Sequence, residues 1–123
     1  MIFIGEKFVS AAEGMDQSTK EREYYILTDV GIYRIEGPSL MRVNSEPEEP
    51  RHLEFAPQWV IDETIEGVFT DGEKIAVLFR EGLLWVNLVP PQFGGGKSFE
   101  FEVGRDEYES WRSDVEVREA RIY

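Results

Sequence analysis

Short hydrophobic runs alternate with glycine-containing turns along the chain, and the pattern is clearest between Trp59 and Val89. It predicts three successive strands joined as two hairpins: Ile65–Thr70, Lys74–Phe79 and Leu83–Val89. The first connection is Asp71-Gly72, a pair typical of a two-residue type I′ turn in which both central residues have positive φ. The second connection is Arg80-Glu81-Gly82.

The second and third of these strands do not alternate between apolar and polar residues. Ile75 to Phe79 contains no polar residue, and Leu83–Val89 contains only Asn87. A strand with one face in water should alternate, because successive side chains point to opposite faces. We therefore expect both faces of this hairpin to be covered, either by the chain's own helix and flanking strands or by a second molecule.

The remaining pattern predicts further strands and one helix. The predicted strands are Met1–Ile4 with Lys7–Val9, Glu23–Thr28, Ile32–Glu36, Leu40–Val43, Ser98–Val103 and Asp114–Tyr123. Gly104–Arg112 is predicted as a helix of two turns with Trp111 on its inner side. The polar segment Ser10–Arg22 and the proline- and glutamate-rich segment Asn44–Pro57 are predicted as loops.

Two of these strands carry a more detailed expectation. In Ser98–Val103, Phe99, Phe101 and Val103 are expected to face inward, and Glu100 and Glu102 outward. In Asp114–Tyr123 the apolar positions change parity near Arg118-Glu119, which predicts a β-bulge.

These elements define the expected fold class. We expect a single domain over residues 1–123 that is mainly β, and α+β at most. Its architecture would be a curved antiparallel sheet or a partly open barrel of about seven or eight strands built from hairpins, with one short helix near the C-terminus.

Composition bounds the class of protein. The chain has 123 residues, of which 41% are hydrophobic and 13% aromatic, typical of a globular domain. It contains no cysteine, which excludes disulfides, thiolate metal sites and a cysteine nucleophile. No apolar run approaches the ~18 residues of a membrane span, and the N-terminus lacks the features of a signal peptide. We therefore expect a cytoplasmic protein that does not interact with membranes.

The net charge of −12 comes from 13 basic and 25 acidic residues spread along the whole chain. A field of this sign repels nucleic acid and anionic membranes and attracts basic proteins. A well-solvated surface is the simpler explanation of the same charge.

No group of residues forms a recognisable catalytic, cofactor or metal motif. Gly94-Gly95-Gly96-Lys97-Ser98 ends like a phosphate-binding loop, but Pro91 stands where the motif needs its first glycine and a predicted strand follows in place of a helix. His52 is the only histidine and lies in a predicted loop without an activated serine motif. We therefore expect no catalytic residues, no cofactor and no metal.

Carboxylates and aromatic residues are the remaining candidates. Asp62, Glu63 and Glu66, or Glu100 and Glu102, are close enough in sequence to bind a cation or act as an acid–base pair, although a solvated acidic face is the simpler interpretation. Tryptophan dominates many binding surfaces, but it also fills the cores of small β domains. We expect Trp85 to belong to the core.

The sequence thus favours a non-enzymatic, acidic protein-binding module with a basic protein partner. In being small, acidic and free of cysteine, it resembles bacterial immunity proteins that neutralise toxins, which implies an inhibitor-type role. The candidate partner-binding residues are the rim acids Glu46, Glu48 and Glu49 and the aromatic anchors Trp59 and Trp111. Two alternatives stay open. One is a small-ligand-binding β-barrel or an enzyme that uses a buried carboxylate, and the other is a structural subunit that homodimerises through the central hairpins.

Overall fold

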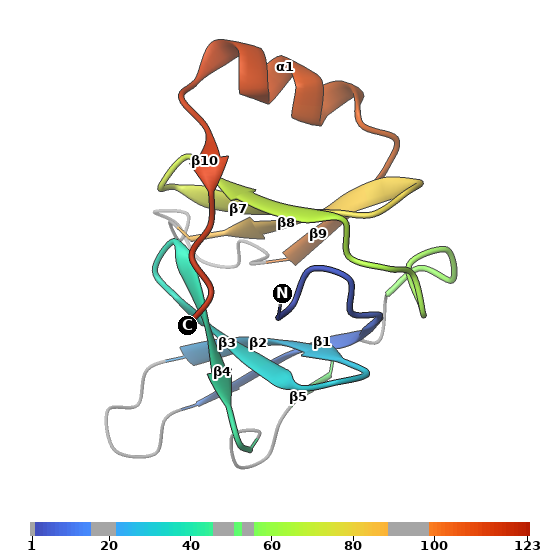
Figure 1. The fold of residues 1–123 in the computed structure, drawn as a ribbon, viewed down its shortest axis with the longest axis vertical. Coiled ribbons are helices and arrows are strands. Elements are labelled where there is room, and N and C mark those ends of the chain that lie inside the picture. Colours follow the sequence, from blue (N-terminus) through green and yellow to red (C-terminus); the bar gives the residue numbers. More distant parts are fainter. Residues whose placement is uncertain (1, 16–21, 46–50, 53–55, 89–98) are drawn as a thin grey trace.

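The computed structural model describes residues 2–15, 22–45, 51–52, 56–88 and 99–123. Within these residues the chain forms ten strands and one helix (Figure 1). In chain order they are β1 (Phe8–Met15), β2 (Arg22–Thr28), β3 (Ile32–Glu36), β4 (Ser39–Val43), β5 (Arg51–His52), β6 (Gly67–Thr70), β7 (Lys74–Leu78), β8 (Gly82–Asn87), β9 (Phe99–Val103), α1 (Asp106–Asp114) and β10 (Arg118–Glu119).

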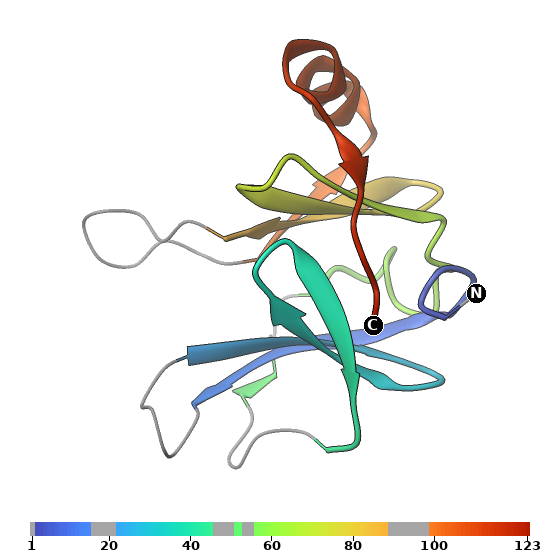
Figure 2. The same cartoon turned by 60° about the vertical axis from the view of Figure 1, so that its left-hand side comes forward.

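The strands form two antiparallel sheets that lie one above the other (Figures 1 and 2). The strand order is β4-β3-β2-β1-β5 in the first sheet and β10-β6-β7-β8-β9 in the second. The predicted fold class, mainly antiparallel β with one short helix near the C-terminus, is confirmed. The sheets are not closed into a barrel, and the described residues contain more strands than expected.

The second sheet is buried on both faces, as the uninterrupted hydrophobic runs of β7 and β8 predict. Ile75 and Val77 face the first sheet and join the main core, whereas Ala76 and Leu78 point the other way. On that outer side they pack with Leu83, Trp85, Tyr108 and Trp111, the last two from α1. The cover is therefore the chain's own helix, which lies across the outer face of the second sheet (Figure 1).

The C-terminal segment connects the two sheets. Arg118 and Glu119 pair with β6, and three residues further on Ile122 forms a parallel bridge with Leu40 of β4. The prediction of one continuous strand with a β-bulge is wrong. Apolar parity changes here because the chain leaves one sheet and joins the other, so its inward direction reverses.

The N-terminal hairpin differs most from expectation. Ser10 to Met15 is not a loop but continues β1, which pairs with β2 from Phe8↔Thr28 to Met15↔Arg22. The predicted strand Met1–Ile4 is also wrong, because Phe3 at φ 71° and Gly5 at φ 92° turn the chain back on itself. Local polarity was outweighed by long-range pairing with β2.

The turn between β6 and β7 is only partly as predicted. Gly72 has the expected positive φ of 96°, but among the described residues Asp71 is not one with positive φ. The last paired residues are Thr70 and Ile75, so four residues lie between them, of which Lys74 already belongs to β7, and the turn is longer than the two residues predicted. The Asp71 carboxylate organises it by accepting hydrogen bonds from the backbone N–H groups of Glu73 and Lys74, at 2.8 and 2.9 Å.

The predicted loop Asn44–Pro57 also needs correction. Arg51–His52 forms β5, which pairs with β1 through Ala12↔His52 and Glu13↔Arg51, so the backbone of His52 belongs to a strand. Its side chain lies outside the described part of the structure, as does the glycine-rich segment 94–98.

Candidate binding surface

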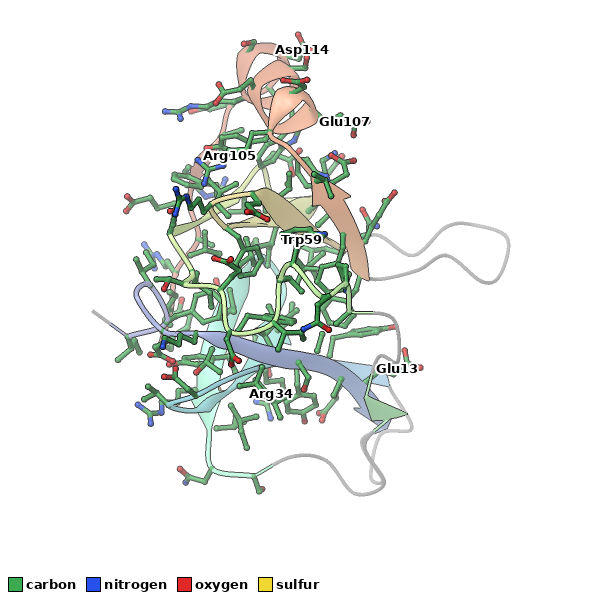
Figure 3. All side chains as sticks on the ribbon, turned by 90° about the vertical axis from the view of Figure 1, so that its right-hand side faces the viewer. Glu13, Arg34, Trp59, Arg105, Glu107 and Asp114 are labelled. Carbon is green, nitrogen blue, oxygen red and sulfur yellow. The ribbon has the colours of Figure 1, made fainter. Side chains whose placement is uncertain are left out.

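Three glutamates gather where α1 meets the edge of the second sheet. Glu100 pairs with Trp85 and Glu102 with Leu83, so both carboxylates lie on the face that α1 covers. Glu107, in the first turn of α1, lies against the Glu102 carboxyl group (Figure 3 labels Glu107 above β9). We call Glu100, Glu102 and Glu107 the glutamate cluster.

The glutamate cluster places like charges close together. Burial and the contact with Glu107 raise the pKa of Glu102, and the negative charges of Glu107 and Glu100 raise it further. A hydrogen bond involving Trp85 acts in the opposite direction but does not offset these effects. Arg105, the arginine that precedes α1, bonds instead to the Glu66 carboxylate and to the carbonyl of Phe79. Repulsion within the cluster therefore remains.

Trp85 of β8 and Trp111 of α1 form an aromatic pair between the helix and the second sheet, next to these carboxylates. The rings of Trp85 and Trp111 meet edge to face with centroids 5.1 Å apart, and the Lys74 ammonium lies 4.3 Å from the Trp85 centroid. The expectation that Trp85 belongs to the core is confirmed, since it is buried. The rigid packing fixes where the strand and the helix present their glutamates.

Trp111 lies in the hydrophobic layer between α1 and the second sheet instead of on the surface. It is buried against β7 and β8, and its indole N–H donates a 2.9 Å hydrogen bond to Asp71. Burial acts to raise the pKa of Asp71, but the hydrogen bonds from Trp111, Glu73 and Lys74 outweigh it and lower the pKa. Trp111 therefore anchors the helix to a turn, and the arrangement offers no free face of its ring to a partner.

Trp59 is half-buried and close to the end of β9 (Figure 3). Its ring meets Phe79 edge to face at 6.2 Å between centroids and covers Gly82, where a Cβ would come within 2.7 Å of it. Gly82 is the register partner of Val103. Trp59 thus keeps some exposure at the same end of the second sheet as the glutamate cluster.

The remaining sequence predictions concern the three rim acids and the inward-facing residues of β9. Glu46, Glu48 and Glu49 lie outside the described residues. Phe99 faces the core as expected, but the expectation for Val103 is wrong, because this side chain is 75% exposed beyond the end of the core. Sequence reasoning paired Glu100 with Glu102 through strand alternation but missed Glu107, which only the docking of α1 brings to them.

A second carboxylate, Glu6, has the opposite environment. It is 8% exposed and accepts hydrogen bonds from the Phe3 N–H at 2.6 Å, the Thr28 hydroxyl at 2.5 Å and the Tyr33 hydroxyl at 2.7–2.8 Å. Burial acts to raise the pKa of Glu6, but these bonds and the charge of Arg42 outweigh it and lower the pKa. Burial, together with Glu6 itself, raises the pKa of Tyr33 to about 12. Glu6 therefore holds the N-terminal turn to the first sheet.

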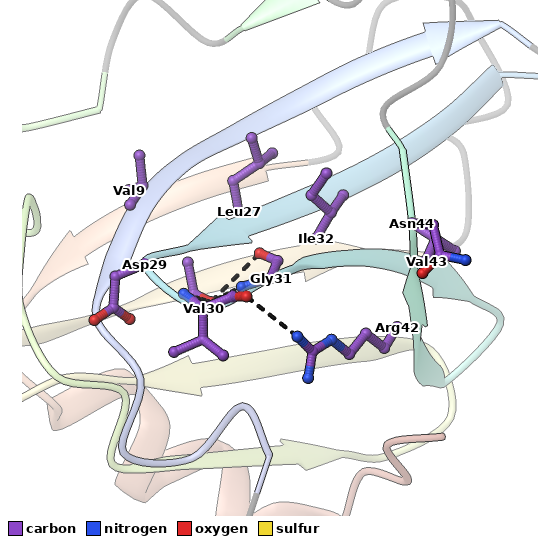
Figure 4. A pocket seen from close by; sticks show the side chains of 10 residues that line it. Val9, Leu27, Asp29, Val30, Gly31, Ile32, Arg42, Val43 and Asn44 are labelled. Carbon is purple, nitrogen blue, oxygen red and sulfur yellow. Dashed lines mark hydrogen bonds between the residues drawn. The ribbon is translucent and has the colours of Figure 1, made fainter.

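A cavity of about 380 Å³ opens on the outer face of the first sheet (Figure 4). Its wall combines aliphatic side chains with the polar residues Thr28, Arg42 and Asn44, and the guanidinium of Arg42 donates a 3.2 Å hydrogen bond to the carbonyl of Val30. Asp29 also lines it, but Glu6 does not. The cavity thus lacks the buried carboxylate that the ligand-binding or enzymatic alternative required.

The described ranges of the chain also bear on metal binding and membrane insertion. They contain no group of three or more histidine, cysteine, aspartate or glutamate side chains arranged to hold a metal ion. They also contain no helix with the length and hydropathy of a membrane span.

Comparison of the chain with protein-family models, with curated proteins and with solved structures gave no match.

Proposed function

We propose that the protein is a non-enzymatic module that binds a basic protein partner through the glutamate cluster. The observation that carries this proposal is geometric: β9 places Glu100 and Glu102 on the face that α1 covers, and the first turn of α1 adds Glu107 beside them. The raised pKa of Glu102, caused by burial and then by Glu107 and Glu100, is consistent with this arrangement. A lysine or arginine side chain from a partner would convert this repulsion into attraction. Binding then gains from relief of a strain already present in the free protein.

The overall charge supports the same role. A net charge of −12 would draw a basic partner into encounter and would make the association rate fall as salt screens the field. An inhibitor- or immunity-type protein that neutralises a basic toxin in the cytoplasm is one role of this kind. The absence of cysteine is compatible with a reducing compartment.

The alternatives have less support. Glu6, the buried carboxylate, has its oxygens occupied by donors from its own chain, which suits a structural role better than proton transfer. In the homodimer alternative a second copy covers the central hairpins, but α1 and the first sheet already cover them. Neither the Glu6 carboxylate nor the central hairpins therefore require a ligand or a second copy of the chain.

The test is a pull-down from cells of the native host, with bound proteins identified by mass spectrometry. Wild type is compared with the triple variant Glu100→Gln/Glu102→Gln/Glu107→Gln. The matched control is Glu73→Gln/Asp114→Asn/Glu116→Gln, which removes three exposed acids elsewhere and changes the net charge equally. We expect a basic protein to be retained by wild type and by the control, and lost from the cluster variant.

The identified partner is then purified, and its association rate is measured over a salt series. We expect the rate to fall as salt rises, because screening is effective beyond about 10 Å at 0.1 M. An acidic partner, or equal retention by both triple variants, would refute the proposed function.

A further inference from the structure

β9, with five residues, is the longest edge strand without an outer partner among the described strands, since the other two such edges, β5 and β10, have two residues each. At the far edge of the second sheet, β6 is paired with β10. In the first sheet, the backbone of β4 bonds to Arg121 and Tyr123 through Leu40 and Arg42. Among the described residues, no strand pairs with the outer side of β9. An edge of this kind is a template for a further strand.

The register shows which backbone groups β9 presents outward. Gly104 N–H donates a 2.7 Å hydrogen bond to the carbonyl of Glu81, so these two residues form a hydrogen-bonded pair. Hydrogen-bonded and non-hydrogen-bonded pairs alternate along an antiparallel ladder. Glu102 and Glu100 therefore direct their backbone groups toward β8, whereas Phe101 and Val103 direct theirs away from it.

The side chains of β9 make its two faces chemically different. Phe99 and Phe101 point between the sheets, where they meet Tyr24 and Phe8 edge to face. Glu100 and Glu102 lie on the α1 face beside Glu107. A strand added to β9 would place alternate side chains next to these two faces, since residues opposite each other share a face.

Charge selects the occupant of this edge. A second copy of the chain paired through the same β9 residues would bring glutamates toward glutamates, and like charges across a strand pair are destabilising. A segment that alternates lysine or arginine with apolar residues would instead place its cations against the glutamate cluster. Its apolar side chains would lie toward exposed Val103 and half-exposed Trp59.

We propose that β9 accepts an extended segment of the basic partner as an additional strand of the second sheet, with basic side chains on the α1 face and apolar side chains on the inner face. This inference rests on the proposed function and specifies its mode of recognition. It also assigns Val103 a role, because its outward N–H becomes a ladder donor and its exposed side chain becomes a contact.

The first test uses a synthetic ten-residue peptide that alternates lysine and valine. Its control has the same composition with the lysines in one block. We expect the free protein to show rapid hydrogen exchange at the Phe101 and Val103 amides and slow exchange at the Glu100 and Glu102 amides. Adding the alternating peptide should slow exchange at Phe101 and Val103, and the block peptide should slow it much less. Slow exchange at Phe101 and Val103 in the free protein, or no change with the alternating peptide, would overturn the proposal.

The second test uses a pair of variants at one position. Val103→Pro removes the outward N–H without removing a bond to β8, whereas Val103→Ala keeps the N–H. We expect Val103→Pro to weaken binding of the alternating peptide about tenfold and Val103→Ala about threefold or less. Both variants should keep the circular dichroism spectrum of the wild type. Equal affinities of the two variants would overturn the edge-strand mode.

The third test separates this mode from the proposed function. Glu100→Lys should weaken binding of the alternating peptide at least tenfold more than Glu116→Lys, which makes the same charge change at an exposed position elsewhere. If both peptides bind equally and the Val103 variants do not differ, the protein binds basic chains but not by strand addition. If neither peptide binds and the pull-down yields no basic partner, both proposals fail. Dimerisation of the chain that protects Phe101 and Val103 would also contradict the basic occupant.

Discussion

Glu6 and Glu102 are the same residue type in opposite circumstances. Hydrogen-bond donors surround the Glu6 carboxylate, and its pKa is lowered despite burial. Burial, the contact with Glu107 and the charges of Glu107 and Glu100 together raise the pKa of Glu102. The fold supplies one carboxylate with partners from three segments and leaves the other crowded by like charges.

The difference separates carboxylates that stabilise the fold from carboxylates that are available to something else. Glu6 also holds Phe3 at a φ of 71°, a conformation that a non-glycine residue adopts only with support from its surroundings. The glutamate cluster supports no comparable backbone feature. In our account its repulsion is tolerated because a basic partner removes it.

The largest expected effect concerns the close packing of β8 against β9 beside the glutamate cluster. A Cβ at Gly82 would come within 2.1 Å of the Glu102 carbonyl oxygen. Gly82→Ala should therefore force β8 and β9 apart and cost about 3 kcal/mol of unfolding free energy, measured by urea denaturation. The control is Gly31→Ala, where the nearest atom is the flexible Arg42 side chain at 3.0 Å and the cost should be below about 1 kcal/mol. Equal costs would mean that β9 is not closely packed on β8.

The next effect concerns Glu6, whose carboxylate accepts hydrogen bonds from three residues. Glu6→Gln removes the charge and sets an amide among three hydrogen-bond donors, which should cost about 2 kcal/mol at pH 7. Glu81→Gln, at an exposed position, is the control and should change the unfolding free energy by less than about 0.5 kcal/mol.

The cost of Glu6→Gln should depend on pH. Because the pKa of Glu6 is lower in the folded chain, its charge stabilises the fold above the ordinary pKa, and this contribution is lost as pH falls through the folded value. The gap between wild type and variant should therefore narrow in acid. A gap that is constant over this range would contradict the assignment.

A smaller effect is expected where a carboxylate holds α1. Asp71→Asn can keep the turn through its carbonyl oxygen but leaves the Trp111 indole N–H without its acceptor, at a cost of about 1 kcal/mol. In a Trp111→Phe background this N–H is absent, so Asp71→Asn should cost clearly less. A double-mutant cycle measures the difference, and additive costs would show that the two side chains are not coupled.

The smallest expected effect has the opposite sign. Because the pKa of Glu102 is raised, folding is opposed by its charge as pH rises above the ordinary value toward the folded one. Glu102→Gln should therefore stabilise the fold at pH 7 by about 0.5 kcal/mol, and the gain should disappear in acid, where wild-type Glu102 is protonated. Thermal denaturation at both pH values measures it. Destabilisation at pH 7 would place Glu102 with Glu6 instead of opposite it.

The sequence predicted the hairpins well because their signals are local. Ile32–Glu36 was predicted with the bounds that β3 has, and the apolar runs of β7 and β8 required cover on both faces. The long β1–β2 hairpin was missed because Ser10 to Met15 carries no apolar alternation and is a strand only through its pairing with β2. The separation into two sheets was missed because it depends on where the terminal segments cross between them.

The candidate site was predictable only in part, for the same reason. Alternation in β9 placed Glu100 and Glu102 on one face, but no local pattern indicates that Glu107 would join them. Trp111 was correctly placed on the inner side of its helix, and that position removes it from the surface where an anchor was expected. Glu6 has no signal in its own neighbourhood, because Thr28 and Tyr33 reach it from a distant hairpin.

The central claim is that the glutamate cluster is crowded in the free protein and relieved by a basic partner strand. Nuclear magnetic resonance titration of the Glu102 carboxyl carbon, with and without the alternating lysine–valine peptide, tests it directly. The account predicts a pKa above the ordinary glutamate value in the free protein and a clear decrease when the peptide is bound, with no such decrease for the block peptide. An ordinary pKa in the free protein, or a raised pKa that binding leaves unchanged, would contradict it.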